Sequence, residues 1–284
     1  MSAAESTVVR FEDVTVQFGE LRALDGVSFA VRAGETRVIA GEAASGKTVL
    51  LKTAVGLIRP DAGRVFLFDE DISDMKERKL VELRARVGIL FQEGGLFDSL
   101  TIEENVAYPL ENQPGLAETS RGAKGMELVA SRVREALRFV ELEKTVDKFP
   151  NELSGGMRRR VGIARAVVTQ PEAVFYDSPT AGLDPITANL IIRLIISQRD
   201  LQNTATLMAT HRYQDGHLMA HFRYNPSKGD LQPYANDDPA RQSTKFMVMR
   251  EGRLLFEGSA SELASNRDLY IRKFAGPAAV PGAA

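Results

Sequence analysis

An eight-residue segment, residues 41–48, constrains the fold of this chain more than any other feature. It reads Gly-Glu-Ala-Ala-Ser-Gly-Lys-Thr, a glycine, four residues, and then Gly-Lys-Thr. Gly41 and Gly46 permit backbone angles and close approaches that a Cβ would forbid, so the N–H groups of the loop can turn inward around an anion. Lys47 would reach the β- and γ-phosphates of a bound nucleotide, and the Thr48 hydroxyl would bind Mg²⁺. The residues expected around the phosphates are Gly41, Glu42, Ala43, Ala44, Ser45, Gly46, Lys47, Thr48 and Val49.

The residues on either side of this segment fit the order strand, loop, helix. Residues 36–40 form a short, largely apolar run that reads as a buried strand. Leu50, Leu51 and Val55 then follow at helical spacing. The N-terminus of that helix would add its positive end to the anion site. The alternative is that residues 41–48 form a glycine-rich turn in an unrelated α/β protein. Such a turn would not require a strand before it and a helix after it.

Composition narrows the class of protein. The chain has 284 residues, of which 44% are hydrophobic and 26% charged, as in ordinary soluble domains. A net charge of −2 creates no global positive field, so we expect no nucleic-acid partner. The absence of cysteine excludes disulfides and thiolate chemistry. Residues 1–6 do not resemble a secretory signal, and the longest apolar candidate, residues 188–196, is too short to span a bilayer.

The pattern along the chain alternates strands and helices, which predicts an α/β fold with a mostly parallel sheet. We assign one domain to residues 7–265, in which 7–91 and 155–265 form the core with an antiparallel β subdomain. Residues 92–154 read as an inserted helical subdomain, and residues 276–284 as a disordered tail. Strands are expected at residues 8–18, 23–31, 36–40, 63–68, 87–91, 173–176, 206–210, 246–249 and 254–256, and helices at 131–140, 161–168 and 190–196.

Three polar residues follow expected strands. Gln92, Asp177 and His211 each come directly after an apolar run, and ligands bind at the carboxyl ends of strands in open α/β sheets. Asp177 could hold Mg²⁺ through water, Gln92 could reach the metal or an attacking water, and His211 would point toward the γ-phosphate. The predicted metal site is therefore Thr48, Gln92 and Asp177. Taken singly, these residues also read as a capping Asp, a solvated Gln and a surface His.

A second anion site is predicted from Leu-Ser-Gly-Gly-Met at residues 153–157. Ser154, Gly155 and Gly156 supply one hydroxyl and bare backbone N–H groups ahead of a helix. The three arginines at residues 158–160 read most simply as a solvated or ion-pairing helix face.

This ordered set resembles the ATP-binding cassette (ABC) ATPases over about residues 7–265. The resemblance implies that two cassettes pair head to tail, as a homodimer or a heterodimer. Residues 153–157 of one then close on ATP and Mg²⁺ held by residues 41–48 of the other. It also implies a role for Asp184 across the interface. The motifs that carry the resemblance are Phe18 as an adenine-stacking aromatic, residues 41–48, Gln92, residues 153–157, Asp177, residues 181–184 and His211.

Residues 91–101 and 105–110 are similar to the Mla-type branch of this family. That similarity implies a cassette on the cytoplasmic face of the inner membrane, attached through an integral permease, with an MCE lipid-binding protein and phospholipid cargo. The groove beside Gln92 and the helical subdomain should receive the permease. An ABC protein of DNA repair or translation is disfavoured, because the chain has one cassette, no long coiled coil and no basic arm.

The chain departs from the family after Asp177, where most members have Glu to polarise the attacking water and this chain has Ser178. Loss of a general base typically costs about 10²- to 10⁴-fold in rate. Two hypotheses stay open. In the first, hydrolysis is slow and depends on His211 and Gln92 with help from Asp184. In the second, the chain is a nucleotide-gated module that barely hydrolyses ATP, or that pairs with an active partner.

Residues 212–244 are longer than the family connection between the histidine and the next strand. Their Gly, Pro, Asn and Asp content predicts loops or a small hairpin and not a long helix. Two interpretations stay open, a surface loop and a contact with the permease or partner cassette. A metal site from His211, His217 and His221 is a weaker alternative.

Overall fold

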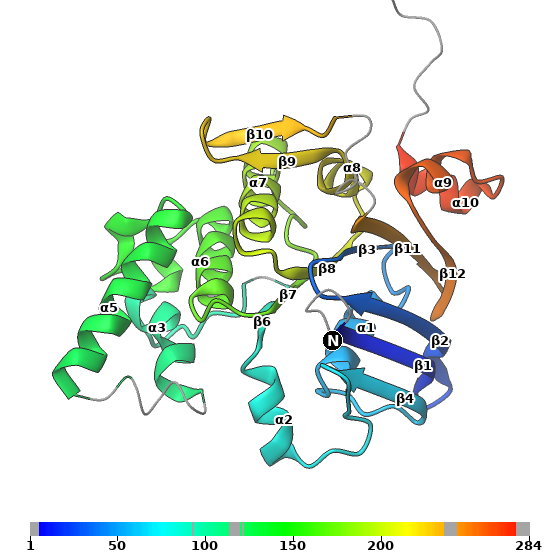
Figure 1. Cartoon of the computed structure of the whole chain (residues 1–284), viewed down its shortest axis with the longest axis horizontal. Coiled ribbons are helices and arrows are strands. Elements are labelled where there is room, and N and C mark those ends of the chain that lie inside the picture. Colours follow the sequence, from blue (N-terminus) through cyan, green and yellow to red (C-terminus); the bar gives the residue numbers. More distant parts are fainter. Residues whose placement is uncertain (1–5, 93, 114–119, 121, 236–242, 277–284) are drawn as a thin grey trace, which may run out of the picture.

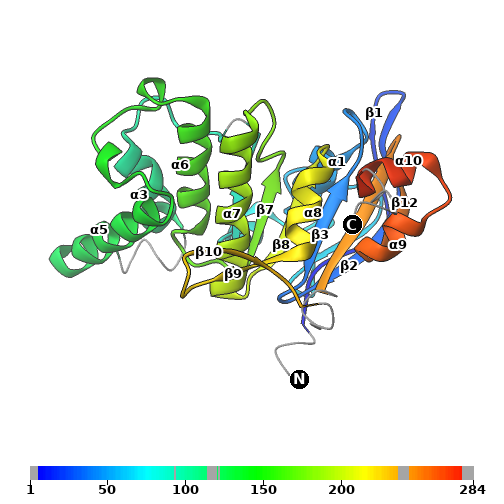
Figure 2. The same ribbon diagram turned by 90° about the horizontal axis from the view of Figure 1, so that it is seen from above.

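The computed structural model describes residues 6–92, 94–113, 120, 122–235 and 243–276. Its elements gather into a central, mostly parallel sheet, an antiparallel sheet on one side and a helical part on the other (Figures 1 and 2). This is the predicted α/β fold with an antiparallel β subdomain and an inserted helical subdomain, and that prediction is confirmed.

The central sheet has the strand order β12-β11-β3-β8-β7-β6, and all neighbours are parallel except β11 and β12. β3, β7 and β8 are buried along their whole length because other elements cover both faces. Successive side chains enter different cores, with Val38 on one face and Ile39 on the other. The strands are β3 Thr36–Ala40, β6 Val87–Leu90, β7 Ala173–Asp177, β8 Ala205–Thr210, β11 Thr244–Arg250 and β12 Arg253–Gly258.

The antiparallel sheet has the order β2-β1-β4-β5 and packs over α1. Leu50 and Leu51 of α1 are buried in the core between this sheet and the central sheet. The β1–β2 hairpin pairs Phe18 with Leu21 at its tip, and Gly19 there has a φ of 59°, which favours glycine. The elements are β1 Thr7–Phe18, β2 Leu21–Arg32, α1 Lys47–Ala54, β4 Ala62–Leu67, β5 Glu70–Asp71 and α2 Glu77–Arg84.

The helical part follows β6. Thr101 and Glu104 form a capping box at the start of α3, and buried Asn105 hydrogen-bonds the loop that leads there from β6. The helices expected at 131–140 and 161–168 overlap α5 and α6 and run one residue past their C-terminal ends, and the helix expected at 190–196 lies within α7. In the described part of the chain no helix has the length and apolarity needed to cross a bilayer. The helices are α3 Ile102–Asn112, α5 Gly122–Phe139, two 3₁₀ turns at Glu143–Thr145 and Pro150–Glu152, α6 Gly155–Val167 and α7 Pro185–Gln202.

Residues after His211 differ from the prediction. They begin with a helix, α8 Tyr213–His221, where loops or a hairpin were expected. The predicted small hairpin follows as β9 Phe222–Asn225 and β10 Asp230–Pro233. The helix was not predicted because its sequence contains Gly216 and two histidines, and these residues weaken the helical pattern. Its buried residues nevertheless pack against the core. Whether residues 212–244 are an insertion relative to the family stays a prediction.

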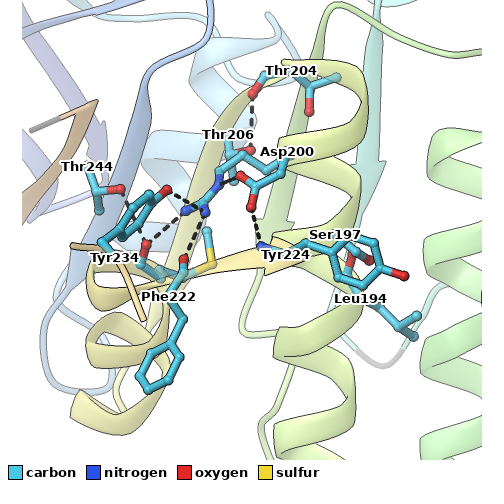
Figure 3. Close-up of polar contacts among 11 residues, drawn as sticks. Leu194, Ser197, Asp200, Thr204, Thr206, Phe222, Tyr224, Tyr234 and Thr244 are labelled. Carbon is cyan, nitrogen blue, oxygen red and sulfur yellow. Dashed lines mark hydrogen bonds and ion pairs between the residues drawn. The ribbon is translucent and has the colours of Figure 1, made fainter. Parts of the chain in front are cut away.

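The β9–β10 hairpin is held against α7 by two neighbouring side chains (Figure 3). Buried Arg199 donates to the carbonyl oxygens of Met219 and Phe222, at 2.8 and 3.0 Å, and to the Tyr234 hydroxyl at 3.0 Å. Asp200 pairs with Arg199 and accepts a 2.7 Å hydrogen bond from the Tyr224 backbone N–H. These bonds also occupy polar groups of β9, and such contacts protect a strand edge from further pairing.

Packing continues beyond residue 265, where the domain was expected to end. Ile271 and Phe274 are buried in the same core as the central helices. Of the predicted tail at residues 276–284, only Gly276 belongs to the described residues. In the Mla-like segment at residues 91–101, only Glu93 lies outside them. The last elements are α9 Ala260–Ser265, α10 Leu269–Arg272 and a 3₁₀ turn, η5, at Lys273–Ala275.

Candidate functional site

Residues 41–48, which we call the phosphate loop, connect β3 to α1 as predicted. A Cβ on Gly41 would lie 2.6 Å from the Met249 carbonyl oxygen, so no larger residue fits there. Gly46 has a φ of 104° and caps α1, and a Cβ on it would lie 2.5 Å from the Ala23 carbonyl oxygen. Ala44 also adopts a left-handed conformation, with a φ of 60°. Alanine is strained in this region, whereas glycine is not.

The Lys47 ammonium lies inside the loop. It donates to the carbonyl oxygens of Gly41 and Glu42, at 2.9 and 2.6 Å, and to the Ser45 hydroxyl at 3.1 Å. Burial lowers the pKa of Lys47, and the nearby Asp177 carboxylate opposes that shift. A buried cation surrounded by loop carbonyls is placed to exchange these contacts for phosphate oxygens.

The phosphate loop opens on a cavity of about 800 Å³. Phe18, half exposed at the tip of the β1–β2 hairpin, lines this cavity. Gln92, Ser178 and His211 also line it, although they come from three different parts of the chain. The predicted residues that line the cavity are Phe18, Glu42, Ala43, Ala44, Ser45, Gly46, Lys47, Thr48, Val49, Gln92, Ser178 and His211.

The strand-end cluster, as we call it, lies at the carboxyl ends of β6, β7 and β8. It consists of Gln92 after β6, Asp177 as the last residue of β7, Ser178 after β7 and His211 after β8. These three strands are neighbours in the parallel sheet, so their carboxyl ends meet at one edge. Asp177 is buried and accepts a 3.2 Å hydrogen bond from the Ser178 hydroxyl. Gln92 and His211 are exposed toward the cavity. The expected convergence of strand ends is therefore present, while the roles of these residues remain predictions.

Backbone contacts fix Ser178 in place. Its φ of 50° is left-handed, and its N–H donates to the Ala209 carbonyl oxygen at 3.0 Å. Buried Arg159, from α6, donates to the carbonyl oxygens of Ser178, Pro179 and Ala181 at 2.8 to 3.0 Å. The helix that begins with the second glycine motif is thus bonded directly to the loop that carries Ser178.

Asp215 connects this loop to the histidine. It is almost completely buried on α8, and one carboxylate oxygen accepts from the hydroxyls of Thr180 and Thr210, at 2.5 and 2.8 Å. Thr180 lies two residues after Ser178, and Thr210 lies immediately before His211. Burial raises the pKa of Asp215, and the two threonine hydroxyls oppose that shift. One carboxylate therefore sets the spacing between the two loops.

The second glycine motif lies away from the cavity of its own chain. Ser154 caps α6 by accepting a 3.3 Å hydrogen bond from the Met157 N–H, and Ser154 and Gly155 are exposed. Asp184 caps α7, and hydrogen bonds from Thr187 lower its pKa. Ser154, Gly155, Gly156 and Asp184 do not line the cavity beside the phosphate loop.

The donors predicted for Mg²⁺ are a hydroxyl, an amide and a carboxylate, from Thr48, Gln92 and Asp177. Oxygen donors of this kind, completed by phosphates and water, suit Mg²⁺. No group of three His, Cys, Asp or Glu side chains is placed to hold a metal among the residues described here. His217 and His221 stack on each other at 4.3 Å on α8. The three-histidine metal site is therefore dropped.

Sequence reasoning missed several residues that line the cavity. Arg22 and Leu21 enter from the β1–β2 hairpin, and Glu251 and Gly252 from the β11–β12 turn. Lys273 and Phe274 come from the C-terminal segment, beyond the expected end of the domain. No local motif surrounds any of them, so only the tertiary structure places them beside the phosphate loop.

The fold and the glycine loop define a P-loop nucleotide-binding protein. A protein-family model described as "ABC transporter" matches residues 24–181, which is more than half of the chain. The chain therefore belongs to the ABC transporter family.

Two curated relatives illustrate the range of this family. "Probable ribonucleotide transport ATP-binding protein mkl" of Mycobacterium leprae is 34% identical over 203 residues, 72% of this chain and 56% of that protein. "Methionine import ATP-binding protein MetN" of Rhizobium johnstonii is 37% identical over 213 residues, 75% of this chain and 56% of that protein. The chain thus spans about half the length of these relatives.

Solved structures match over more of the chain. The ATP-binding cassette MJ0796 in a dimeric post-hydrolysis state bound to ADP and Pi has a TM-score of 0.71 and 27% identity, and the match covers 89% of this chain and 98% of that one. A second dimeric MJ0796 structure has a TM-score of 0.72 and 26% identity, with the same coverage.

Proposed function

We propose that this chain is the ATP-binding subunit of a membrane transporter and that it works by ATP-driven closure of a cassette dimer. One observation carries the proposal. The phosphate loop shares one cavity with Gln92, Ser178 and His211 of the strand-end cluster, and buried Asp177 lies directly before Ser178. Ser154, Gly155 and Asp184 do not line this cavity. A head-to-tail pair would bring the second glycine motif of each copy to the cavity of the other. The dimeric state of both matched MJ0796 structures supports this arrangement.

Within the closed pair, the phosphate loop would bind the phosphates through its N–H groups and Lys47. The Phe18 ring would stack on adenine, an interaction worth about 1–3 kcal/mol for base stacking on aromatics. Thr48, Gln92 and Asp177 would hold Mg²⁺, which neutralises phosphate charge when bound. Ser154 and the α6 N-terminus of the partner copy would contact the γ-phosphate side.

Hydrolysis is proposed to be slow. Ser178 has no charge with which to orient water, so catalysis depends on positioning and on charge stabilisation. His211 and Gln92 would carry the reaction, with Asp184 acting across the interface. The second candidate is a nucleotide-gated module with almost no turnover, or one that pairs with an active cassette. Ser178 itself is the observation that favours this candidate.

Closure would do work on a permease because ATP binds the closed form more tightly than the open form. The contact is proposed at the groove beside Gln92, where Leu96, Asp98 and Pro150 line a depression. The half-exposed rings of Phe97 and Tyr108 pack together nearby at 4.7 Å. This exposed aromatic pair beside the depression supports the proposed contact.

The proposed cargo is phospholipid or a related hydrophobic molecule, moved with Mla-type permease subunits and an MCE protein. This part rests on the similarity of residues 91–101 and 105–110 to that branch. The names of the curated relatives indicate other cargo, ribonucleotides for mkl and methionine for MetN. The proposed location is the cytoplasmic face of the inner membrane, held there by the permease.

The decisive test is ATP turnover of the chain with its permease, compared with Lys47→Ala. We expect MgATP-dependent phosphate release that falls at least about 100-fold in the variant, because a preorganised charge on the transferring phosphoryl group is lost. Equal rates in the two proteins would end the ATPase proposal. MgATP binding without turnover would favour the gated module.

The cargo is tested separately. The complex is purified from membranes, and the bound molecule is extracted and identified. Phospholipid bound at a fixed ratio to the complex supports the Mla-type proposal. Methionine or a nucleotide in its place would contradict the lipid proposal and leave the ATPase proposal intact.

A further inference from the structure

The last described elements of the chain reach the nucleotide cavity. We call residues 269–275, which comprise α10 and η5, the C-terminal strap. Phe274 is buried, packs edge-on against the Tyr270 ring at 5.4 Å, and lines the cavity together with Lys273. Ile271 anchors the strap in the main core. The strap is thus a packed part of the fold beside the phosphate loop.

Tyr270 lies over the first residues of the phosphate loop. Its hydroxyl donates to the Met249 carbonyl oxygen at 2.9 Å and accepts from the Glu42 N–H at 3.4 Å. The Met249 carbonyl is the same group that excludes a Cβ at Gly41. Tyr270 therefore fixes the end of β11 and the backbone of the phosphate loop to each other.

Lys273 contacts the Glu42 side chain. The Lys273 ammonium lies 2.6 Å from a Glu42 carboxylate oxygen, and the pairing lowers the pKa of Glu42 and raises that of Lys273. The Glu42 carbonyl oxygen accepts the 2.6 Å hydrogen bond from Lys47. Glu42 is thus held through its N–H, its carbonyl and its carboxylate.

The Glu42–Lys273 pair is exposed, so it contributes little to folding stability. The charge of Glu42 matters because of its position. Glu42 places a carboxylate at the mouth of a cavity meant for phosphates, and like charges a few ångströms apart repel. Lys273 cancels this charge, with a smaller contribution from Arg250.

We propose that the C-terminal strap is part of the nucleotide site, in which Tyr270 positions the phosphate loop and Lys273 neutralises Glu42. This inference rests on the proposed binding of MgATP. The two residues act by different means, one through hydrogen bonds to backbone and one through charge. Their variants should therefore respond differently to salt.

The test is calorimetric titration of the full chain with MgATP. Lys273→Met is expected to weaken binding about three- to tenfold, because an unpaired carboxylate then faces the phosphates. The matched control is Arg272→Met, which removes a neighbouring exposed cation that does not line the nucleotide cavity. Adding Glu42→Gln to Lys273→Met should restore affinity, since no charge is left to neutralise. The effect of Lys273→Met should shrink at 1 M salt.

Tyr270→Phe keeps the ring and removes the hydroxyl. We expect a loss of MgATP affinity of similar size that persists at high salt, and faster hydrogen exchange of the amides at residues 42–46 without nucleotide. Affinity of Lys273→Met equal to that of Arg272→Met, or no rescue by Glu42→Gln, would overturn the role of Lys273. Unchanged exchange in Tyr270→Phe would overturn the role of Tyr270.

Failure of the proposed function gives a different result. In that case wild type and Lys47→Ala show the same absence of MgATP binding. Hydrogen exchange then still decides whether the strap positions the loop.

Discussion

The phosphate loop and the strand-end cluster meet at the same cavity, which Gln92, Ser178 and His211 line, but the two regions are built in different ways. The loop is eight consecutive residues whose geometry depends on glycines and on backbone N–H groups. The cluster takes single side chains from the ends of β6, β7 and β8. It is held together by contacts from elsewhere, chiefly Arg159 and Asp215.

Each of the two regions contains one unusual residue, and the difference in construction shows what that residue changes. In the loop, Ala44 occupies a left-handed position and costs some stability, yet Lys47 remains inside the loop. In the cluster, Ser178 keeps its backbone contacts but lacks a base. We therefore expect nucleotide binding and bond cleavage to be separable in this chain, because the two proposed activities depend on regions with different construction.

The largest expected effect on turnover comes from a substitution in the strand-end cluster. Ser178→Glu should raise the turnover of MgATP about 10²- to 10⁴-fold, since it supplies the general base that the wild type lacks. MgATP affinity should change little because the phosphate loop is untouched. Single-turnover hydrolysis and calorimetry measure the two quantities.

Ser178→Gln is the control for this gain. Glutamine has the size of glutamate and an amide in place of the carboxylate, so its rate should stay near that of the wild type. An equal gain in both variants would show that side-chain size, and not a base, limits the reaction.

A smaller effect on turnover is expected from Asp215, the residue that joins the loops of the strand-end cluster. Asp215→Ala should lower kcat about tenfold with little change in KM for ATP, because the Thr180 and Thr210 hydroxyls lose their shared acceptor. Asp215→Asn keeps an acceptor oxygen and should retain most of the rate. Asp200→Asn, whose side chain bonds the β9–β10 hairpin, is the control at a site distant from both loops.

A purely structural role for Asp215 would give another pattern. The same tenfold loss would then appear when Asp215→Ala is combined with His211→Ala. If Asp215 acts by positioning His211, the combined variant should be no slower than His211→Ala alone.

The smallest effect is expected in the phosphate loop. Ala44→Gly should raise the free energy of unfolding by about 0.5–1 kcal/mol, because glycine removes the strain of a φ of 60°. Ala43→Gly is the matched control, at a neighbouring residue without positive φ, and should lower stability by a similar amount. Denaturant unfolding measures both. A loss of stability in Ala44→Gly would contradict the strain interpretation.

The fold class and the phosphate loop could be predicted because their signals are local. The order of strand, glycines and helix around Lys47 needs no distant residue, and neither does the apolar run before Asp177. The convergence of Gln92, Asp177 and His211 also followed from their places at parallel strand ends. Helix α8 was not predicted, because Gly216 and its polar neighbours weaken a local pattern that core packing then overrides.

Residue types and their order along the chain are enough to predict an α/β protein with a phosphate loop, and they show Ser178 where a base is usual in the family. Those conclusions come from residue types and short spacings, which act through local backbone geometry. Three contacts could be seen only in the folded chain: Asp215 joins the loops of Ser178 and His211, Arg199 holds the hairpin on α7, and Lys273 reaches Glu42. Each of these contacts joins segments that are distant along the chain, and only packing around the central sheet brings such segments together.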